Sequence, residues 1–162
     1  MPEPWTNLTD GVDVILTAAV TANGMIAREA TETVDWSADL SLFRKQTMGQ
    51  TVIMGSKTEA TLATDLGGRQ VVVMHRDMKP VDVLALVKTE HCFIIGGAWT
   101  YSKFAPHLTH AYLTFHPIVF PSNAIPLFSH LASKIELTFV KKIAVREENG
   151  IYQFQYMVNT VD

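Results

Sequence analysis

Short apolar runs alternate with polar or amphipathic stretches over the first two thirds of the chain. Runs of this length, rich in β-branched residues and bounded by turn residues, are typical of buried strands and are too short for buried helices. The predicted strands are Val12–Val20, Gln50–Met54, Gln70–Met74, Cys92–Ile95 and His110–His116. We expect Val12–Val20 to be a central strand and Gln70–Met74 to be buried.

Helices are predicted between these strands. Ala38–Thr47 carries apolar Leu40, Leu42 and Phe43 among charged residues, which is the pattern of an amphipathic helix, and Ser37 is a suitable N-cap. Shorter helices are expected at Glu59–Leu62, Val81–Lys88 and Ala98–Phe104. Strands that alternate with helices favour an α/β fold with a central, mostly parallel sheet flanked by helices, and such sheets bind ligands at the carboxyl ends of their strands.

The last third of the chain has a different pattern. Ile135–Arg146 and Gly150–Val158 alternate apolar and polar residues on either side of a polar turn, which predicts a C-terminal antiparallel hairpin. Asn123–His130 is expected to be a loop. The two patterns together describe a parallel core that is completed by an antiparallel edge.

Composition narrows the class of protein. The 162 residues are 48% hydrophobic and 18% charged, which fits a single domain over residues 1–162 with a loosely ordered lead-in at 1–11. The net charge of -3, with scattered Lys and Arg, argues against a nucleic-acid partner. No apolar run has membrane-spanning length, and the N-terminus does not resemble a signal peptide. Because Cys92 is the only cysteine, we expect a reducing, cytoplasmic setting.

Three predicted strands end in turns suited to a nucleotide. The strand Cys92–Ile95 is followed by Gly96-Gly97-Ala98, and the strand Gln50–Met54 by Gly55-Ser56-Lys57-Thr58. Glycines at a helix start let backbone N–H groups approach a phosphate. His75-Arg76, after the third strand, could pair with a 2′-phosphate, which favours NADPH over NADH. Each turn taken alone could instead be an ordinary helix cap or a solvated surface charge.

Other polar residues have two interpretations each. Asp39 lies near the start of a helix with apolar inward positions, so it is either a cap-type charge or a buried acid that holds a cationic or amidine-like ligand edge. Arg69 is either a surface residue or a clamp for a carboxylate or phosphate. His107 and His110 lack a third ligand at suitable spacing, so no metal site is predicted.

The order of these motifs resembles the dihydrofolate reductase family over roughly residues 12–158. The resemblance is carried by AVTANGMIA (19–27), DWSADLSLF (35–43), TVIMGSKTEATL (51–62), LGGRQVVVMHR (66–76), FIIGGAWTYSKF (93–104) and HAYLTFH (110–116). It implies a dihydrofolate reductase-like fold and reduction of 7,8-dihydrofolate to tetrahydrofolate, a step of one-carbon metabolism, with NADPH.

The resemblance also implies roles for individual residues. Asp39 matches the acid that binds the pterin and assists protonation at N5, and Trp36 and Thr114 match residues that reach that acid. Substrate-binding positions are Phe43, Leu66, Ile95 and Tyr101, with Arg69 gripping the glutamate tail. Cofactor-binding positions are Ala19, Ile26, Gly55, Ser56, Lys57, Thr58, His75, Arg76, Gly96, Gly97, Ala98, Trp99 and Thr100.

Some features depart from the family pattern. The segment Asp35–Asp39 is shorter than the usual Pro-Trp-x-Leu-Pro-x-Asp and lacks both prolines, and Ala27 and Ala98 replace usual glycines. The short segment and PIVFPSNAIPLF (117–128) resemble the related riboflavin-pathway reductases, which reduce a ribosylaminopyrimidine 5′-phosphate with NADPH. A non-catalytic NADPH-binding domain is a third interpretation. The family occurs as monomers on the folate side and as homodimers on the riboflavin side, so the resemblance leaves either state open.

Overall fold

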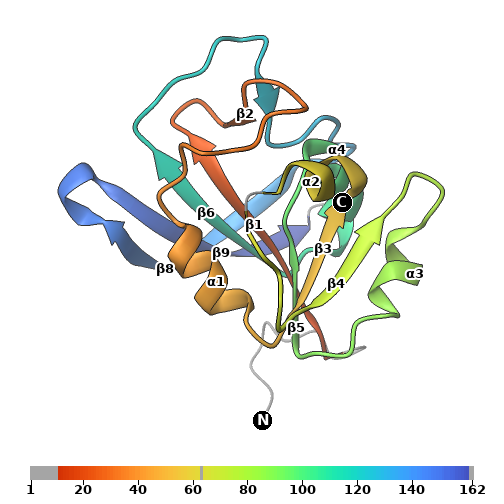
Figure 1. The fold of residues 1–162 in the computed structure, drawn as a ribbon. Helices are drawn as coiled ribbons and strands as arrows, with labels where there is room; N and C mark the ends of the chain where they lie inside the picture. The colour runs from red at the N-terminus through yellow and green to blue at the C-terminus, as the bar shows by residue number, and fades with distance from the viewer. Residues whose placement is uncertain (1–10, 63, 161–162) are drawn as a thin grey trace.

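A seven-stranded sheet organises the part of the chain that the computed structural model describes, residues 11–62 and 64–160 (Figure 1). Five strands are parallel to one another, and the last two are antiparallel to their neighbours. The order across the sheet is β4 (Gln70–Met74), β3 (Thr51–Gly55), β5 (His91–Ile94), β1 (Asp13–Thr21), β6 (His110–His116), β9 (Ile151–Thr160) and β8 (Ile135–Arg146). The predicted α/β architecture with a C-terminal hairpin is confirmed.

Strand β1 lies in the middle of the sheet, as predicted, because both of its faces are apolar. Leu16 and Val14 face one hydrophobic cluster, and Ile15 between them faces the other. Leu16 is aligned with Ile94 of β5 on one side and with Ala111 of β6 on the other. All of these side chains are buried, so alternate residues of one strand connect two cores.

Helices cover both faces of the sheet (Figure 1). Phe43 of α1 (Leu40–Thr47) packs on the cluster around Ile15, whereas Phe104 of α4 (Ala98–Phe104) belongs to the opposite cluster with Val83 of α3 (Pro80–Leu84). The helix α2 is Ser56–Thr61, and the short 3-10 turn η1 (Ala105–His107) extends α4. The prediction for α4 is confirmed, whereas α3 ends four residues before the predicted Lys88.

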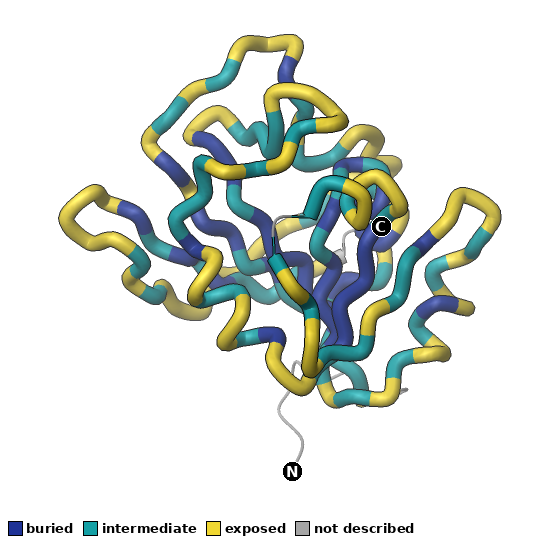
Figure 2. Tube along the Cα trace, viewed as in Figure 1, coloured by how far each residue is buried: buried dark blue, intermediate teal, exposed yellow. Residues whose placement is uncertain are grey.

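The predicted burial of Gln70–Met74 is wrong. β4 is an outer strand of the sheet, with Val71 43% exposed and only Met74 buried (Figure 2). The other outer strand, β8, is exposed along most of its length. A run of apolar residues has the same appearance in a central strand and in an edge strand, so the sequence pattern alone could not separate the two positions.

The loops that the sequence analysis left irregular contain smaller elements. β2 (Met25–Ala27) pairs antiparallel with β7 (Ile125–Pro126), which joins the predicted loop at 123–130 to the segment after β1. The hairpin turn contains the 3-10 helix η2 (Glu147–Asn149) and Gly150, whose positive φ of 73° suits glycine. Within the described residues, no helix is both long and apolar enough to cross a membrane.

Candidate active site

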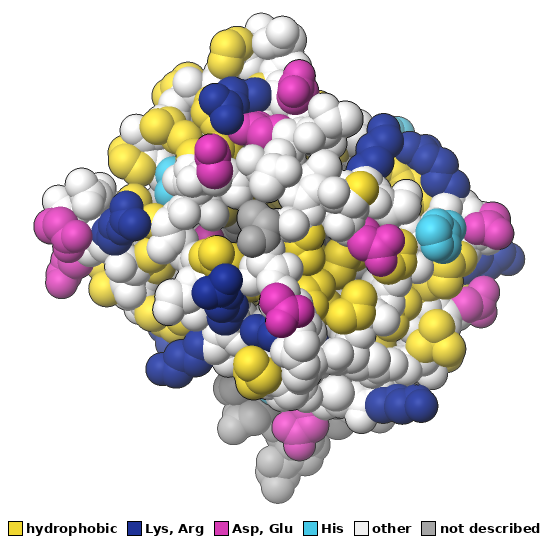
Figure 3. All heavy atoms as spheres, in the orientation of Figure 1, with side chains coloured by type: hydrophobic (Ala, Val, Ile, Leu, Met, Phe, Trp, Pro, Cys, Tyr) yellow, Lys and Arg dark blue, Asp and Glu magenta, His cyan; other side chains and the backbone are white. Residues whose placement is uncertain are grey.

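The carboxyl ends of the parallel strands border a cavity of about 470 Å³. Following the sheet order, Arg76 comes after β4, Lys57 after β3 and Gly96 after β5, and Ala19 belongs to β1. Predicted site residues in its lining are Ala19, Ile26, Asp39, Phe43, Gly55, Ser56, Lys57, Thr58, Arg76, Ile95, Gly96, Gly97, Ala98, Trp99, Thr100 and Tyr101. On the face in Figure 3, hydrophobic side chains gather centrally, with Lys and Arg side chains to their upper right.

Two glycine turns meet at the middle of this edge. The backbone N–H of Gly55 donates to the carbonyl of Gly96 over 2.8 Å, and the Gly96–Gly97 peptide bond is cis. Gly96 has a φ of 125°, a backbone conformation that residues with a Cβ rarely adopt. At Gly55 an added Cβ would lie only 2.7 Å from Thr100 Oγ1. The glycines therefore let the backbone of the two turns approach closely at the cavity wall.

Cationic side chains lie at the β3–β4 end of the cavity. Lys57 and Arg76 both contribute to its lining. The guanidinium of Arg76 stacks over the Trp99 ring, with 4.9 Å from Cζ to the ring centroid, and Lys103 Nζ lies 5.8 Å from the same ring. His75 is exposed and does not line the cavity. Of the predicted His75–Arg76 pair, only Arg76 therefore borders the space in which a ligand would lie.

Asp39 is a buried acid in the cavity wall, with 9% of its surface exposed. It occupies the N-cap position of α1, where its carbonyl accepts from the N–H of Phe43, but its side chain makes no capping hydrogen bond. The prediction of Ser37 as N-cap is wrong, and α1 begins two residues later than expected. Since the carboxylate does not cap the helix, it can face a ligand.

Tyr101 lies close to this acid. Its hydroxyl donates to the carbonyl of Thr17 over 2.8 Å, and the ring is buried in the core. Burial, and secondarily the negative charge of Asp39, raises the pKa of the Tyr101 phenol above its ordinary value. Tyr101 therefore remains a neutral hydrogen-bond donor at physiological pH.

Trp36 and Thr114 lie beside the cavity rather than in its lining. Thr114 is aligned with the lining residue Ala19 and is fully buried. Trp36 Nε1 and Thr114 Oγ1 are buried, and neither has a hydrogen-bond partner within the described part of the chain. Buried polar groups are nearly always hydrogen-bonded, so these two atoms suit a site completed by water or ligand.

Two predicted substrate residues also lie outside the lining. Leu66 packs in the same cluster as Phe43. Arg69 donates from Nε to Thr47 Oγ1 over 2.7 Å, and its two terminal nitrogens donate to the carbonyls of Gly67 and Arg44. A guanidinium has five N–H donors, so these three bonds orient its planar fork and leave two N–H groups outside them.

The sequence analysis assigned no role to one residue that contacts this site. His116, the last residue of β6, is 3% exposed, and its Nε2 accepts from the backbone N–H of Ala38 over 2.9 Å. The Ala38 N–H belongs to the residue immediately before Asp39. A lone histidine at a strand end carries no motif signal, so only the fold could reveal this contact.

Comparison with known proteins agrees with this geometry. A sequence profile described as "Dihydrofolate reductase" matches residues 13–156. The chain is 32% identical over 120 residues to "Dihydrofolate reductase type 8" of Escherichia coli, covering 60% of this chain and 70% of that protein. It is 29% identical over 159 residues to "Dihydrofolate reductase" of Buchnera aphidicola, covering 87% and 94% of the two chains. With "Dihydrofolate reductase type 3" of Salmonella typhimurium it shares 32% identity over 116 residues, covering 63% of this chain and 70% of that protein.

The profile match covers most of the chain and spans the strands and turns that form the cavity. The α/β architecture and the position of the cavity at the carboxyl edge of the parallel strands agree with them. The chain therefore belongs to the dihydrofolate reductase family and is an oxidoreductase.

Proposed function

We propose that this protein reduces 7,8-dihydrofolate to tetrahydrofolate, with NADPH as the hydride donor. The main support is the buried carboxylate of Asp39 in a cavity that Lys57 and Arg76 also line. Glu29 and Glu32 border the same cavity, but Glu29 is exposed and the Glu32 carboxylate is paired with Arg28. One acid and one polyanion-binding end are what a pterin and a dinucleotide require. The three relatives described above are dihydrofolate reductases by name, which supports the same substrate.

The residues at the β3–β5 edge fit a dinucleotide phosphate. Lys57 supplies a positive charge, Ser56 and Thr58 supply hydroxyls, and the glycine turns supply backbone that no Cβ shields. Arg76 can pair with a 2′-phosphate, which NADPH has and NADH lacks. When bound, the cofactor supplies the hydride. The protein's part is to hold the donor and acceptor rings together where little water can enter.

Asp39 would hold the amino and N3 edge of the pterin and assist protonation at N5. Trp36 Nε1 and Thr114 Oγ1 are buried donors without partners in the described structure, which suits a water that links the acid to the substrate. Phe43 and Ile26 line the cavity with apolar surface and would exclude other water from the reacting rings. In this arrangement the acid holds or relays a proton, and no protein nucleophile is needed.

Arg69 would bind the glutamate tail of the substrate. Its bonds to Thr47, Gly67 and Arg44 fix the plane of the guanidinium, and a planar fork matches a carboxylate with two parallel bonds. Leu66, in the cluster with Phe43, would contact the benzoyl ring between pterin and tail.

The test is oxidation of NADPH by the purified protein, followed by absorbance with and without dihydrofolate. We expect oxidation that depends on dihydrofolate and that an antifolate inhibits. A control with NADH should give much slower oxidation at equal concentration. If NADPH binds but dihydrofolate does not promote its oxidation, the proposal is wrong. The ribosylaminopyrimidine 5′-phosphate is then the next substrate to assay, and inactivity with both would indicate a non-catalytic binding domain.

A further inference from the structure

His116 connects three parts of the candidate acid site through one buried imidazole. Its Nε2 lies 2.9 Å from the backbone nitrogen of Ala38, and its Nδ1 lies 2.9 Å from the carbonyl oxygen of Thr114. Its ring meets the Trp36 ring edge to face, at 5.2 Å between centroids and an interplanar angle of 88°. Thus Trp36, Thr114 and the residue before Asp39 all contact the same side chain.

The hydrogen bonds define the tautomer of this histidine. A backbone N–H can only donate, so Nε2 must present a lone pair to Ala38. Both atoms near Nδ1 are carbonyl oxygens, of Thr114 at 2.9 Å and of Val20 at 3.3 Å, so Nδ1 carries the hydrogen. This form gives each ring nitrogen a partner, and the carbonyls of Val20 in β1 and Thr114 in β6 hold the ring in place.

The segment that His116 holds is also anchored by Trp36, whose ring packs on Phe120, and by the Asp39 carbonyl, which accepts from Phe43. Residues 35–39 contain no proline, and the side chain of Asp39 makes no capping bond to α1. The Ala38 N–H bond therefore connects this segment to β6, from a residue 78 positions away in the sequence. Because Asp39 follows Ala38 directly, a shift of the Ala38 backbone would move the carboxylate as well.

We propose that His116 is a positioning residue for the acid: through the bond from the Ala38 N–H to Nε2 it fixes the backbone that places the Asp39 carboxylate. The effect on turnover rests on the proposed reduction of dihydrofolate, whereas the bond itself can be tested without activity. A displacement of about 1 Å at a reacting group can reduce the rate about a hundredfold, so the loss of this bond should be visible in kinetics.

Two variants distinguish the roles of the two ring nitrogens of His116. His116→Gln places an amide oxygen near the position of Nε2, so it can still accept from Ala38. His116→Asn places its amide near Nδ1, so it can still donate to Thr114 but does not reach Ala38. Both replacements are polar, and neither is much larger than histidine. Each variant is therefore the matched control of the other.

The first measurement is hydrogen exchange of the Ala38 amide, which needs neither substrate nor cofactor. We expect slow exchange in the wild type and in His116→Gln, and exchange at least tenfold faster in His116→Asn. Exchange in His116→Asn that is as slow as in the wild type would show that the Ala38 amide is protected without Nε2, and would overturn the proposal whatever reaction the protein catalyses.

The second measurement is kinetic. We expect kcat/KM for dihydrofolate to fall about tenfold or more in His116→Asn and to be largely retained in His116→Gln, with the Kd for NADPH unchanged in both. If His116 acts through Asp39, His116→Asn should cause no further loss in an Asp39→Asn background. Additive losses, or equal losses in Gln and Asn variants, would overturn the proposal. A wild type inactive with dihydrofolate contradicts the proposed function instead, and the exchange result still decides the role of His116.

Discussion

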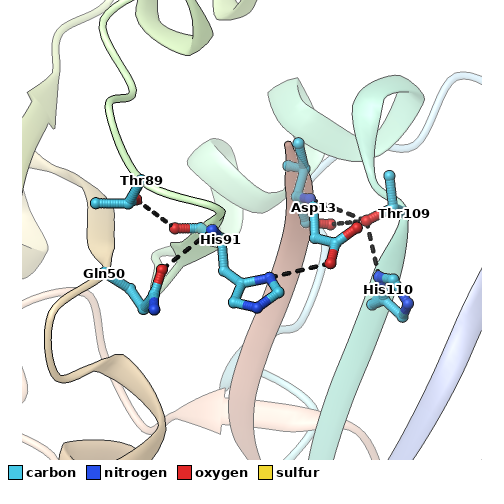
Figure 4. A network of polar contacts seen from close by, with 7 residues as sticks. Asp13, Gln50, Thr89, His91, Thr109 and His110 are labelled. Carbon is cyan, nitrogen blue, oxygen red and sulfur yellow. Dashed lines mark hydrogen bonds and ion pairs between the residues drawn. The ribbon is translucent and has the colours of Figure 1, made fainter. Parts of the chain in front are cut away.

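The two ends of the parallel strands differ in how many contacts their polar side chains make with one another. At the carboxyl end, Trp36 Nε1 and Thr114 Oγ1 have no partners in the described structure, and Asp39 does not cap its helix. At the amino end, polar groups contact one another closely (Figure 4). Asp13 Oδ2 lies within ion-pair distance of His91 Nδ1, at 3.0 Å, although this nitrogen makes no hydrogen bond within the described residues. Thr109 Oγ1 lies 2.8 Å from His110 Nδ1.

The amino-end network also ties the strands together. Thr109 Oγ1 accepts from the N–H of Val14 in β1 over 2.9 Å, and the N–H of His91 in β5 donates to Gln50 Oε1 (Figure 4). Paired groups stabilise the fold, whereas unpaired groups keep their bonding capacity for a ligand at a cost in stability. We therefore interpret the amino end as structural and the carboxyl end as functional.

The largest predicted effect is that of Asp39→Asn. We expect kcat for dihydrofolate to fall by about a hundredfold or more near neutral pH, because in the proposed mechanism an amide can neither hold nor relay the proton. The residual rate should rise as the pH falls, since solvent must then provide the proton. The melting temperature should be unchanged or higher, because a buried charge is removed. Kinetics from pH 5 to 8 measure the fall in kcat and its pH dependence, and thermal unfolding measures the melting temperature. NADPH titration checks that the variant still binds the cofactor.

Asp39→Ala is a second check on the same comparison, because it removes the side chain without adding an amide. If either variant keeps wild-type turnover, the acid role of Asp39 is wrong. If both lose turnover but also lose NADPH binding, the substitution has disturbed the cavity as a whole and the functional end is defined incorrectly.

Arg76→Gln sharpens the comparison at the opposite side of the cavity. We expect the affinity for NADPH to fall roughly tenfold to a hundredfold, with little change for NADH, because the proposed partner of Arg76 is the 2′-phosphate. Lys103→Gln is the matched control, since it removes a charge near the same Trp99 ring from a residue outside the cavity lining. A similar loss for both variants, or for both cofactors, would contradict the assignment. Fluorescence titration of the wild type and both variants with NADPH and with NADH gives the dissociation constants.

The sequence could predict much of the functional end because its parts are local. The glycine turns follow strands of clear apolar pattern, and α4 begins at Ala98 as predicted. The exposure of β4, by contrast, depends on which strand lies beside it. The contact of His116 with Ala38 and the bonds of Arg69 to Thr47 and Arg44 join distant segments, so no local spacing predicts them.

At the amino end, Asp13→Asn should change stability rather than activity. Its carboxylate faces His91 Nδ1 at 3.0 Å, with both side chains partly exposed, so we expect the free energy of unfolding to fall by up to about 1 kcal/mol. Turnover and NADPH affinity should match the wild type. Denaturant unfolding measures the first quantity. A loss of turnover larger than the loss of folded protein would show that this end also serves the reaction.

The smallest predicted effect is on the pH dependence of stability. Burial lowers the pKa of His110, an effect that the nearby charge of Asp13 partly opposes. The folded protein therefore binds fewer protons at His110 than the unfolded chain, whose histidine has an ordinary pKa of about 6.5. The stability that His110 contributes is present above that pH and is lost as the pH falls below it.

His110→Gln removes this titration, so its unfolding free energy should fall less between pH 8 and pH 5 than that of the wild type. Comparison at pH 8 measures the cost of the lost contact with Thr109, and the change on acidification isolates the proton uptake. In an Asp13→Asn background, the pKa of His110 should fall further, since the carboxylate that raises it is gone, and the acid-induced loss should extend over a wider pH range. If the unfolding free energy of the wild type and of His110→Gln falls equally with decreasing pH, the acid sensitivity arises from groups outside this network. That result would also weaken the contrast between the two ends of the sheet.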